Sequence, residues 1–291
     1  VISTLDWSLQ QQAEESLTKF GKSNKEQFNA KNAGMIGIDP KTGQILVMIG
    51  SIDYFDKTND GNFNVTLGHR QPGSSFKPFV YATAFNKGYR PETTLFDLET
   101  EFSSTCTPEG VPINPDGKVE DCYKPQNYDE IFRGPISLRE ALSQSINIPS
   151  IKLLYLVGIK DAIKTAKEMG ITGLNEPDRY GLTLVLGGGE VTLLDLTSAY
   201  SVFANDGVRN PYSSILKITD SGGKVVEEFT PNPRRILPEN TARDISSILS
   251  DNVARLPAYG PNSPLKFDDR DVAAKTGTTN DTRDAWVIGY T

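Results

Sequence analysis

Ser74 and Lys77 of the stretch "RQPGSSFKPF" have the residue types and the spacing of a nucleophile and its base. Proline is tolerated only in the first turn of a helix, so Pro78 predicts that a helix begins at about Ser74 or Ser75. Ser74 would lie at the helix N-terminus, which favours developing negative charge, and Lys77 would lie on the same face. A serine becomes nucleophilic when a group such as a desolvated lysine takes its proton. The alternative is a helix cap beside an exposed lysine, since the Ser-x-x-Lys spacing alone occurs by chance in most proteins of this length.

A second candidate group is Ser145 and Asn147, which lie between the segment "LREALSQ" and Pro149. A hydroxyl and an amide at a helix end can point into the same cleft. The serine would relay a proton there, and the asparagine would bind a peptide-like carbonyl or amide group. Ordinary capping of the helix end is the alternative for this pair alone.

A third candidate group, Lys275, Thr276, Gly277 and Thr278, follows the short apolar segment "DVAA". Alternate residues of a strand share a face, so Lys275 and Gly277 point one way and the two threonines the other. Glycine inside a strand often marks a place where another backbone comes close. An extended substrate along this strand would meet a cation, hydroxyls and N–H groups, which suit a terminal carboxylate. A solvent-exposed edge strand is the alternative.

The elements that must hold these groups are strands near both ends of the chain, with helices between them. Hydrophobic periodicity predicts a helix over residues 6–20, then a hairpin turning at Pro40–Gly43, then a helix from the Ser74 region to Gly88. Further helices are predicted for "SLREALSQ", "PSIKLLYLVG", "KDAIKTAKEMG", "TLLDLTSAYSVFANDG" and "NTARDISSILSDNV", and strands within "SSILKITDSGGKVVEEF", "DVAAKTGT" and "DAWVIGYT". This order predicts an α+β fold, with one sheet built from distant segments and a largely helical lobe inserted in it.

Composition excludes several classes of function. The net charge of −7 argues against a nucleic-acid partner, which needs a basic face. No run of about 18 or more apolar residues exists, and the first residues lack the pattern of a signal peptide. Cys106 and Cys122 with the single His69 give no four-ligand zinc set, so we expect no metal and no other cofactor. The two cysteines are equally compatible with a disulfide and with two free thiols.

In chain order the three groups read Ser-x-x-Lys, Ser-x-Asn and Lys-Thr-Gly, the set found in penicillin-binding proteins and serine β-lactamases. Over nearly its whole length the chain resembles the transpeptidase domain of class A penicillin-binding proteins, the bifunctional cell-wall synthases. The resemblance is carried by "RQPGSSFKPFVYATAF", "YKPQNYD", "SLREALSQSINIPSIKLL", "LGGGEVTLLDLTSAYSVFANDG" and "KTGTTNDTRDAWVIGYT". The residues before Phe-Lys-Pro, and Thr-Thr-Asn after Lys-Thr-Gly, are similar to class A rather than class B members.

The resemblance implies a D,D-transpeptidase that cross-links peptidoglycan stem peptides and is inhibited by β-lactams. Ser74 would form an acyl-enzyme on D-Ala-D-Ala, with Lys77 as its proton acceptor, and Ser145 would pass a proton to the leaving D-alanine. Asn147 would hold the substrate peptide. The terminal carboxylate would be held by Lys275, Thr276, Gly277 and Thr278, and the oxyanion hole would consist of the backbone N–H groups of Ser74 and Thr278.

The implied fold is that of penicillin-recognising serine transpeptidases and β-lactamases, an antiparallel sheet flanked by helices with a helical lobe. We expect one domain over residues 1–291, with a sheet lobe of about 1–90 plus 265–291 and a mainly helical lobe of about 125–264. Family members usually continue with another strand and a closing helix, so we expect a fragment of a longer protein. That parent would carry an upstream glycosyltransferase domain and a transmembrane anchor, and would act outside the cytoplasmic membrane, in line with a Cys106–Cys122 disulfide.

Related classes of enzyme fit less well. A Ser-His-Asp hydrolase is excluded because the only histidine, His69, lies five residues before Ser74, and no Gly-x-Ser-x-Gly elbow surrounds that serine. Class A β-lactamases carry a glutamate four residues before the Asn of a Leu-Asn pair. Here Ile171 stands four residues before Asn175, so we expect slow hydrolysis of the acyl-enzyme. A D,D-carboxypeptidase or a β-lactam-binding sensor remains the alternative, because either would share all three motifs.

Overall fold

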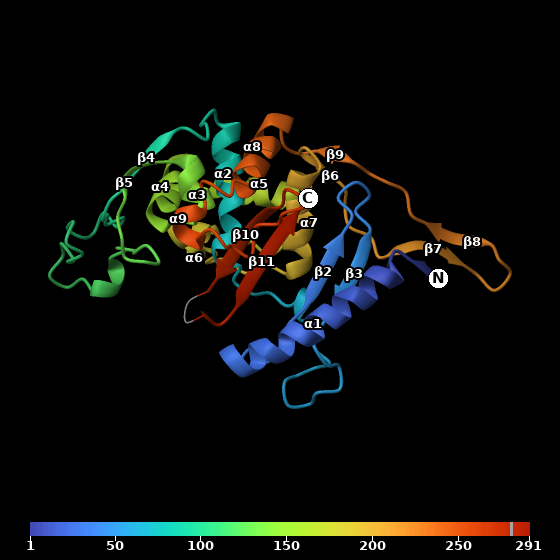
Figure 1. The fold of residues 1–291 in the computed structure, drawn as a ribbon. Helices are drawn as coiled ribbons and strands as arrows, with labels where there is room; N and C mark the ends of the chain where they lie inside the picture. The colour runs from blue at the N-terminus through green and yellow to red at the C-terminus, as the bar shows by residue number, and fades with distance from the viewer. Residues whose placement is uncertain (280–281) are drawn as a thin grey trace.

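The N-terminal segment is a helix packed on a hairpin. The computed structural model, which describes residues 1–279 and 282–291, places α1 (Trp7–Phe28) on β3 (Ile45–Ile49), the antiparallel partner of β2 (Met35–Ile38) (Figure 1). Asp6 caps α1 by accepting a hydrogen bond from the N–H of Leu9. The predicted helix and hairpin are confirmed, and the helix continues past residue 20.

Helix α2 (Lys77–Asn86) is the centre of the main hydrophobic core. Its residues from Lys77 to Phe85 are all buried, as expected of a helix enclosed on every side. The helices that contact α2 come from distant parts of the chain (Figure 1): α3 (Leu138–Ser143), α4 (Asn147–Val157), α5 (Ile159–Met169) and α8 (Glu239–Leu249). The helices predicted between the two ends of the chain are therefore present and form one core.

Side-chain caps set two of the helix starts in this core. Ser137 and Glu140 form a capping box at the start of α3, each side chain accepting from the other residue's backbone N–H. Thr192 caps α7 (Leu193–Ala204) by accepting from the Asp195 N–H. The Asp195 carboxylate does not return to Thr192 but accepts two hydrogen bonds from Thr172. It therefore ties the loop after α5 to the start of α7.

The remaining elements are short. The additional helical segments are η1 (Val65–Leu67), η2 (Gly73–Phe76), η3 (Val119–Asp121), α6 (Pro177–Tyr180), η4 (Gly181–Leu186) and α9 (Leu256–Tyr259). The additional strands are β1 (Ile2–Ser3), β4 (Thr94–Asp97), β5 (Gly134–Ser137), β6 (Val208–Arg209), β7 (Ile215–Thr219), β8 (Val225–Glu228) and β9 (Arg234–Arg235). Among them, β7 pairs with both β1 and β8, which confirms the predicted strand-turn-strand and joins it to the N-terminus.

The two ends of the chain each supply an antiparallel strand pair, but these pairs do not form one sheet. Strand β10 (Ala273–Thr278) pairs with β11 (Ala285–Tyr290), and β2 pairs with β3, as separate two-stranded sheets among the described residues. The prediction of a single hydrogen-bonded sheet was therefore wrong in this detail. Among the described residues no backbone hydrogen-bond ladder links β2 or β3 to β10 or β11, and the two pairs are instead connected through side-chain packing on α7, which contacts both β2 and β11.

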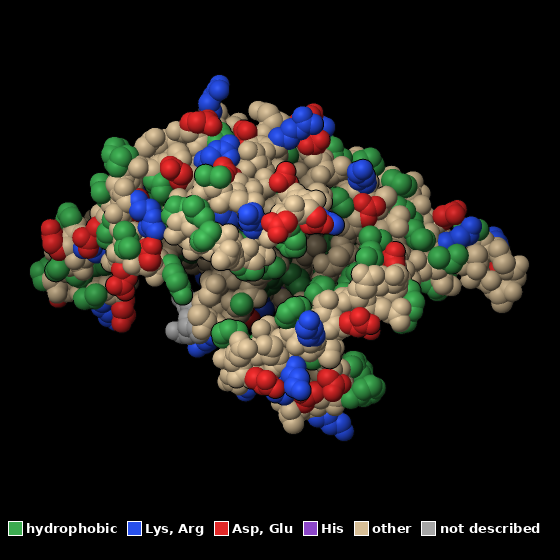
Figure 2. Space-filling model, in the orientation of Figure 1, with side chains coloured by type: hydrophobic (Ala, Val, Ile, Leu, Met, Phe, Trp, Pro, Cys, Tyr) green, Lys and Arg blue, Asp and Glu red, His purple; other side chains and the backbone are tan. Residues whose placement is uncertain are grey.

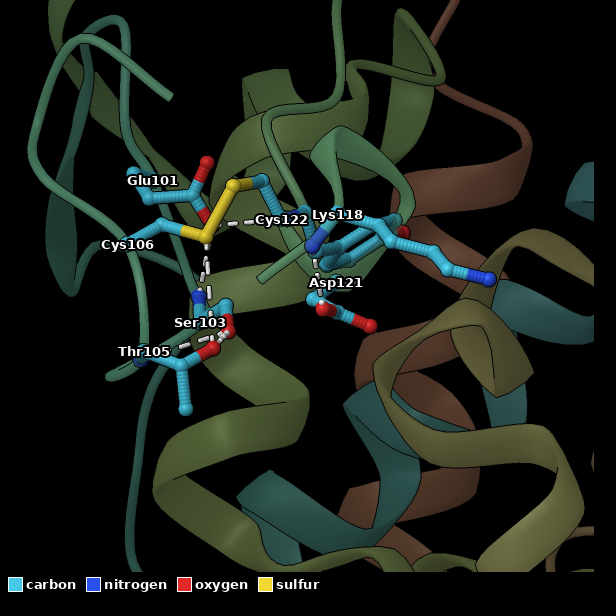
Figure 3. The surroundings of a disulfide bond; sticks show 8 residues. Glu101, Ser103, Thr105, Cys106, Lys118, Asp121 and Cys122 are labelled. Atoms are coloured by element: carbon cyan, nitrogen blue, oxygen red, sulfur yellow. Dashed lines mark hydrogen bonds between the residues drawn. A yellow bond between two sulfur atoms is a disulfide. The ribbon is translucent and has the colours of Figure 1, made fainter. Parts of the chain in front are cut away.

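Residues 98–133 form an irregular excursion between β4 and β5, at one end of the molecule in Figure 1. Within it, Cys106 and Cys122 are joined by a disulfide, with their Cα atoms 5.6 Å apart (Figure 3). Next to it, the Glu101 carboxylate accepts hydrogen bonds from the N–H groups of Ser103 and Tyr123. The two halves of the excursion are thus held together covalently and by hydrogen bonds.

The face of the molecule in Figure 2 carries charges of both signs. In Figure 2 the Lys and Arg side chains are interspersed with Asp and Glu side chains over the visible face. None of the helices in residues 1–279 and 282–291 is both long enough and apolar enough to cross a membrane.

Candidate active site

Ser74 lies in a 3-10 turn and not in the α-helix itself. The turn η2 spans Gly73–Phe76, and α2 begins at Lys77, whose N–H donates to the Ser74 carbonyl. The predicted start at Ser74 or Ser75 is therefore a 3-10 start, with regular helix a few residues later. Pro78 stands in the first turn of α2, where its missing N–H costs no hydrogen bond. Ser74 is half-buried at the start of this buried helix.

Lys77 is fully buried, and its ammonium group is held by the segment of the second motif. Nζ donates to the carbonyl oxygen of Ser145 at 2.6 Å, to that of Ile146 at 3.2 Å and to Asn147 Oδ1 at 2.9 Å. Burial, and then the charge of Lys275, hold the pKa of Lys77 well below its usual range. The lowered pKa favours the neutral amine, which is the form that can accept a proton.

Lys275 reaches the same segment from β10. Its Nζ donates to Ser145 Oγ at 2.8 Å and to the Thr276 carbonyl at 2.9 Å, and the side chain is only 2% exposed. Burial, and then the nearby Arg255, lower the pKa of Lys275 to about 7. Ser145 Oγ also lies 3.4 Å from Lys77 Nζ, so one hydroxyl bridges the two lysines. All three motifs therefore meet at Ser145.

Glycines allow the motifs to approach closely. A Cβ atom on Gly277 would collide with the carbonyl oxygen of Pro72, and one on Gly73 would collide with the backbone of Thr278. Gly73 also has a φ of 57°, in the left-handed region that favours glycine. The strand glycine does mark a close backbone approach, but the neighbouring backbone is the η2 turn. Strand β10 is thereby packed directly against the turn that carries Ser74.

The faces of β10 follow the predicted alternation. Lys275 and Gly277 are buried, whereas Thr276 is half-buried and Thr278 is exposed. The hydroxyl of Tyr259, on α9, lies 2.7 Å from Thr276 Oγ1. Sequence reasoning missed this tyrosine, because no motif spacing connects it with β10.

A second tyrosine forms a hydrogen bond with η2, the turn that carries Ser74. Tyr200, on α7, donates its hydroxyl hydrogen to the carbonyl oxygen of Ser75 at 2.6 Å, and both residues are buried. No sequence pattern predicts a role for this residue either. Its sequence neighbours are those of an ordinary helix, and only its contact with η2 in the folded structure shows its role.

Residues that would serve other mechanisms do not join the site. His69 is exposed and lies near Gly173. Ile171 is buried in the apolar core, so no carboxylate occupies the position at which a class A β-lactamase has its glutamate. Across residues 1–279 and 282–291 no cluster of His, Cys, Asp and Glu side chains could hold a metal ion. Asn280, part of the Thr-Thr-Asn stretch, lies outside the described residues.

Known proteins are similar to this chain in sequence and in fold. Residues 33–291 match the family model of the penicillin binding protein transpeptidase domain. The chain is 36% identical over 263 residues to penicillin-binding protein 1A of Neisseria lactamica, and 35% identical over 257 residues to that of Aquifex aeolicus, with 88% of this chain aligned in each. It spans 30% and 32% of the length of those two relatives.

Solved structures of penicillin-binding proteins have a similar fold. Penicillin-binding protein 1A from Haemophilus influenzae superposes with a TM-score of 0.71 at 25% identity, over 89% of this chain and 41% of that one. PonA1 from Mycobacterium tuberculosis gives a TM-score of 0.77 at 24% identity, over 100% of this chain and 73% of that one. Fold and site together define a serine acyltransferase of the penicillin-recognising class. The chain belongs to the penicillin-binding protein transpeptidase domain family.

Proposed function

We propose that the chain is the D,D-transpeptidase unit of a cell-wall synthase, which cross-links peptidoglycan stem peptides through an acyl-enzyme on Ser74. The observation that carries the proposal is the bridge formed by Ser145 between two buried lysines of lowered pKa. In such a cluster the lowered pKa values favour a neutral amine, and the hydroxyl between the lysines can move a proton, next to a serine at a helix start.

In the first step Ser74 Oγ attacks the carbonyl carbon of the penultimate D-alanine, and its proton passes to Lys77. The C–N bond to the terminal D-alanine then breaks, and the proton reaches the leaving amine through Ser145. In the second step an amino group of a neighbouring peptide attacks the ester of Ser74. A new amide bond forms as the ester C–O bond to Ser74 breaks, and the proton lost by the attacking amine returns to Ser74 Oγ.

Substrate binding is assigned to the groups around this bridge. Asn147 Nδ2 donates to the Gln126 carbonyl at 2.9 Å and retains a second hydrogen for a substrate carbonyl. Lys275, Thr276 and Thr278 would hold the terminal carboxylate, with Gly277 allowing the close packing of their strand. The backbone N–H groups of Ser74 and Thr278 would form the oxyanion hole, which the close approach of Thr278 to Gly73 supports.

Proteins of similar structure support stem peptides and β-lactams as ligands. PonA1 is described in complex with penicillin V, and a protein from Eggerthella lenta as the D,D-transpeptidase domain of a peptidoglycan glycosyltransferase. We propose a longer parent protein with an upstream glycosyltransferase domain and a membrane anchor, acting outside the cytoplasm. A disulfide is compatible with that compartment. Within residues 1–291 we retain the proposed sheet lobe (about 1–90 and 265–291) and helical lobe (about 125–264).

The test is a cross-linking assay with a pentapeptide donor ending in D-Ala-D-Ala and an amine acceptor, read by mass spectrometry. Release of D-alanine with formation of the donor–acceptor amide, both absent in Ser74→Ala, is the expected result. Release of D-alanine with water as the only acceptor would indicate a carboxypeptidase. Acylation by a β-lactam without turnover of the peptide would indicate a sensor.

A further inference from the structure

The first turn of α4 is capped from outside its own helix. Its N-cap residue, Ile146, has no side chain that could accept a hydrogen bond. The N–H groups of Asn147 and Ile148 instead donate to the side-chain oxygen of Asn127, at 3.0 Å and 3.2 Å. Asn127 therefore performs the role of an N-cap residue from a position 20 residues earlier in the chain.

The orientation of the Asn127 amide is set by Asp97. Asn127 Nδ2 donates to both carboxylate oxygens of Asp97, at 2.8 Å and 3.0 Å, and to the Ile131 carbonyl at 2.8 Å. Asp97 is 0% exposed and Asn127 is 3% exposed. A flipped amide would set its oxygen against the carboxylate and its NH₂ against the N–H groups of α4, so only one orientation satisfies all partners.

The charge of Asp97 is compensated where the irregular excursion returns to the core. The Arg133 N–H donates to Asp97 Oδ2 at 3.0 Å, and the Arg133 guanidinium lies 3.8 Å from the same oxygen. Asp97 ends β4 and pairs with Gly134, which begins β5. Both ends of the excursion therefore meet at this carboxylate, and its charge is fixed beside Asn127.

The segment that Asn127 caps is the one that holds both lysines of the site. Ser145 has a φ of 62°, which is unusual for a residue with a side chain and persists only where neighbours enforce it. Lys77 Nζ donates hydrogen bonds to the backbone oxygens of residues 145 and 146 and to Asn147 Oδ1. A shift of this segment would move all three acceptors together.

We infer that Asn127 and Asp97 are positioning residues of the acyl transfer proposed above. They fix the segment 145–147, and through it the place of Lys77 Nζ and Ser145 Oγ relative to Ser74. The inference rests on the proposed function for its catalytic consequence. The alternative is that the buried pair supports only the stability of the fold.

An exchange of Asp97 and Asn127 that conserves charge distinguishes a positioning role from a role in stability alone. Asn127→Asp keeps an acceptor for the N–H groups of α4 but places two carboxylates side by side. The double variant Asp97→Asn with Asn127→Asp restores one amide donor, one carboxylate and the acceptor toward α4. Ile131 O keeps its hydrogen bond from Arg133 Nη1 in that variant. Asn210→Asp is the matched control: Asn210 is 3% exposed, and its amide donates to the carbonyls of Pro40 and Lys41.

Two readouts are measured on folded protein: the rate of acylation by benzylpenicillin against pH, and hydrogen exchange of the peptide that covers residues 145–150. We expect Asn127→Asp to acylate about 100-fold more slowly at neutral pH, the scale of a misplacement of about 1 Å. Its deficit should shrink as pH falls, because like-charge repulsion raises the pKa of one carboxyl, which then donates to the other. The double variant should recover most of the rate and the slow exchange, and Asn210→Asp should change neither.

Two results would overturn the inference. One is a folded Asn127→Asp variant with the wild-type rate and pH profile. The other is a folded double variant that is no better than the single one. If the wild-type chain forms no adduct, the proposed function is contradicted. Hydrogen exchange then still decides whether Asn127 and Asp97 fix the start of α4, since unchanged exchange in Asn127→Asp would contradict that on its own.

Discussion

Ser145 Oγ accepts a hydrogen bond from Lys275 Nζ at 2.8 Å, although the two residues are 130 positions apart in the chain. The same oxygen lies 3.4 Å from Lys77 Nζ. Because each lysine Nζ carries N–H donors whether it is charged or neutral, the serine can accept from both and keep its own hydrogen free for a third group. A hydroxyl in this position is suited to carry a proton between a lysine and a substrate amine.

Removing this hydroxyl should impair acylation strongly. We expect Ser145→Ala and Ser145→Gly to lower the rate of acylation by benzylpenicillin by about 10²–10⁴-fold, the contribution of a positioned acid–base group. Glycine adopts the positive φ of residue 145 without strain, whereas alanine does not. A difference in rate between the two variants would therefore report a backbone effect. Ser143→Ala is the control, since Ser143 Oγ bonds only the Glu140 carbonyl in the structure described. A rate in both Ser145 variants equal to that of the control would contradict the relay.

Tyr259 should tune the binding of the substrate carboxylate through Thr276. Tyr259→Phe removes the 2.7 Å hydrogen bond and leaves the ring in place. A net hydrogen bond contributes about 0.5–1.5 kcal/mol, so we expect the apparent affinity for a D-Ala-D-Ala donor to weaken by about 2- to 10-fold. Tyr290→Phe, which loses a contact with Ser246 instead, should leave this affinity unchanged. Equal effects of the two variants would show that Thr276 needs no support from Tyr259.

Stability should depend on pH through Lys275. Burial, and then Arg255, lower its pKa to about 7 in the folded chain, whereas an unfolded lysine titrates near about 10.4. Between these pH values the unfolded state binds more protons, so the free energy of unfolding rises with pH from about 7 to about 10. Thermal unfolding of wild type and Lys275→Met across this range tests the claim. The Tm of wild type minus the Tm of Lys275→Met should increase as pH rises. A difference that stays constant with pH would refute the lowered pKa of Lys275.

The packing of β10 on the serine turn should tolerate no side chain at Gly277. In Gly277→Ala the new Cβ would collide with the Pro72 carbonyl, so strand and turn must separate. We expect a loss of about 1–3 kcal/mol in stability, together with acylation too slow to measure on the wild-type time scale. Gly222→Ala is the matched control, because its Cβ would meet only the Asp220 side chain at 3.3 Å. Calorimetry and adduct formation measure the two effects separately.

Sequence patterns predicted the three motifs because each is local. Ser74 and Lys77 lie within one turn, and the residues of β10 alternate with a strand's period. The partners that lie across the fold escaped prediction, since no periodicity relates Asn127 to α4 or Tyr259 to Thr276. These contacts are set by tertiary packing alone.

The strand arrangement was predicted in type but not in connection. Both strand pairs are antiparallel as expected, yet no ladder of the described residues joins them, and α7 contacts β2 in one pair and β11 in the other. Apolar alternation identifies a strand and its buried face, but it does not specify which strand pairs with it.

The central claim is that Ser74 carries the acyl group, and intact mass after incubation with benzylpenicillin tests it most directly. We expect a long-lived adduct of one penicillin per chain, which is lost in Ser74→Ala. Ser75→Ala should retain it, because the Ser75 hydroxyl donates to the Pro72 carbonyl in the wild-type chain. An adduct that persists in Ser74→Ala, or none on the wild-type chain, would contradict it.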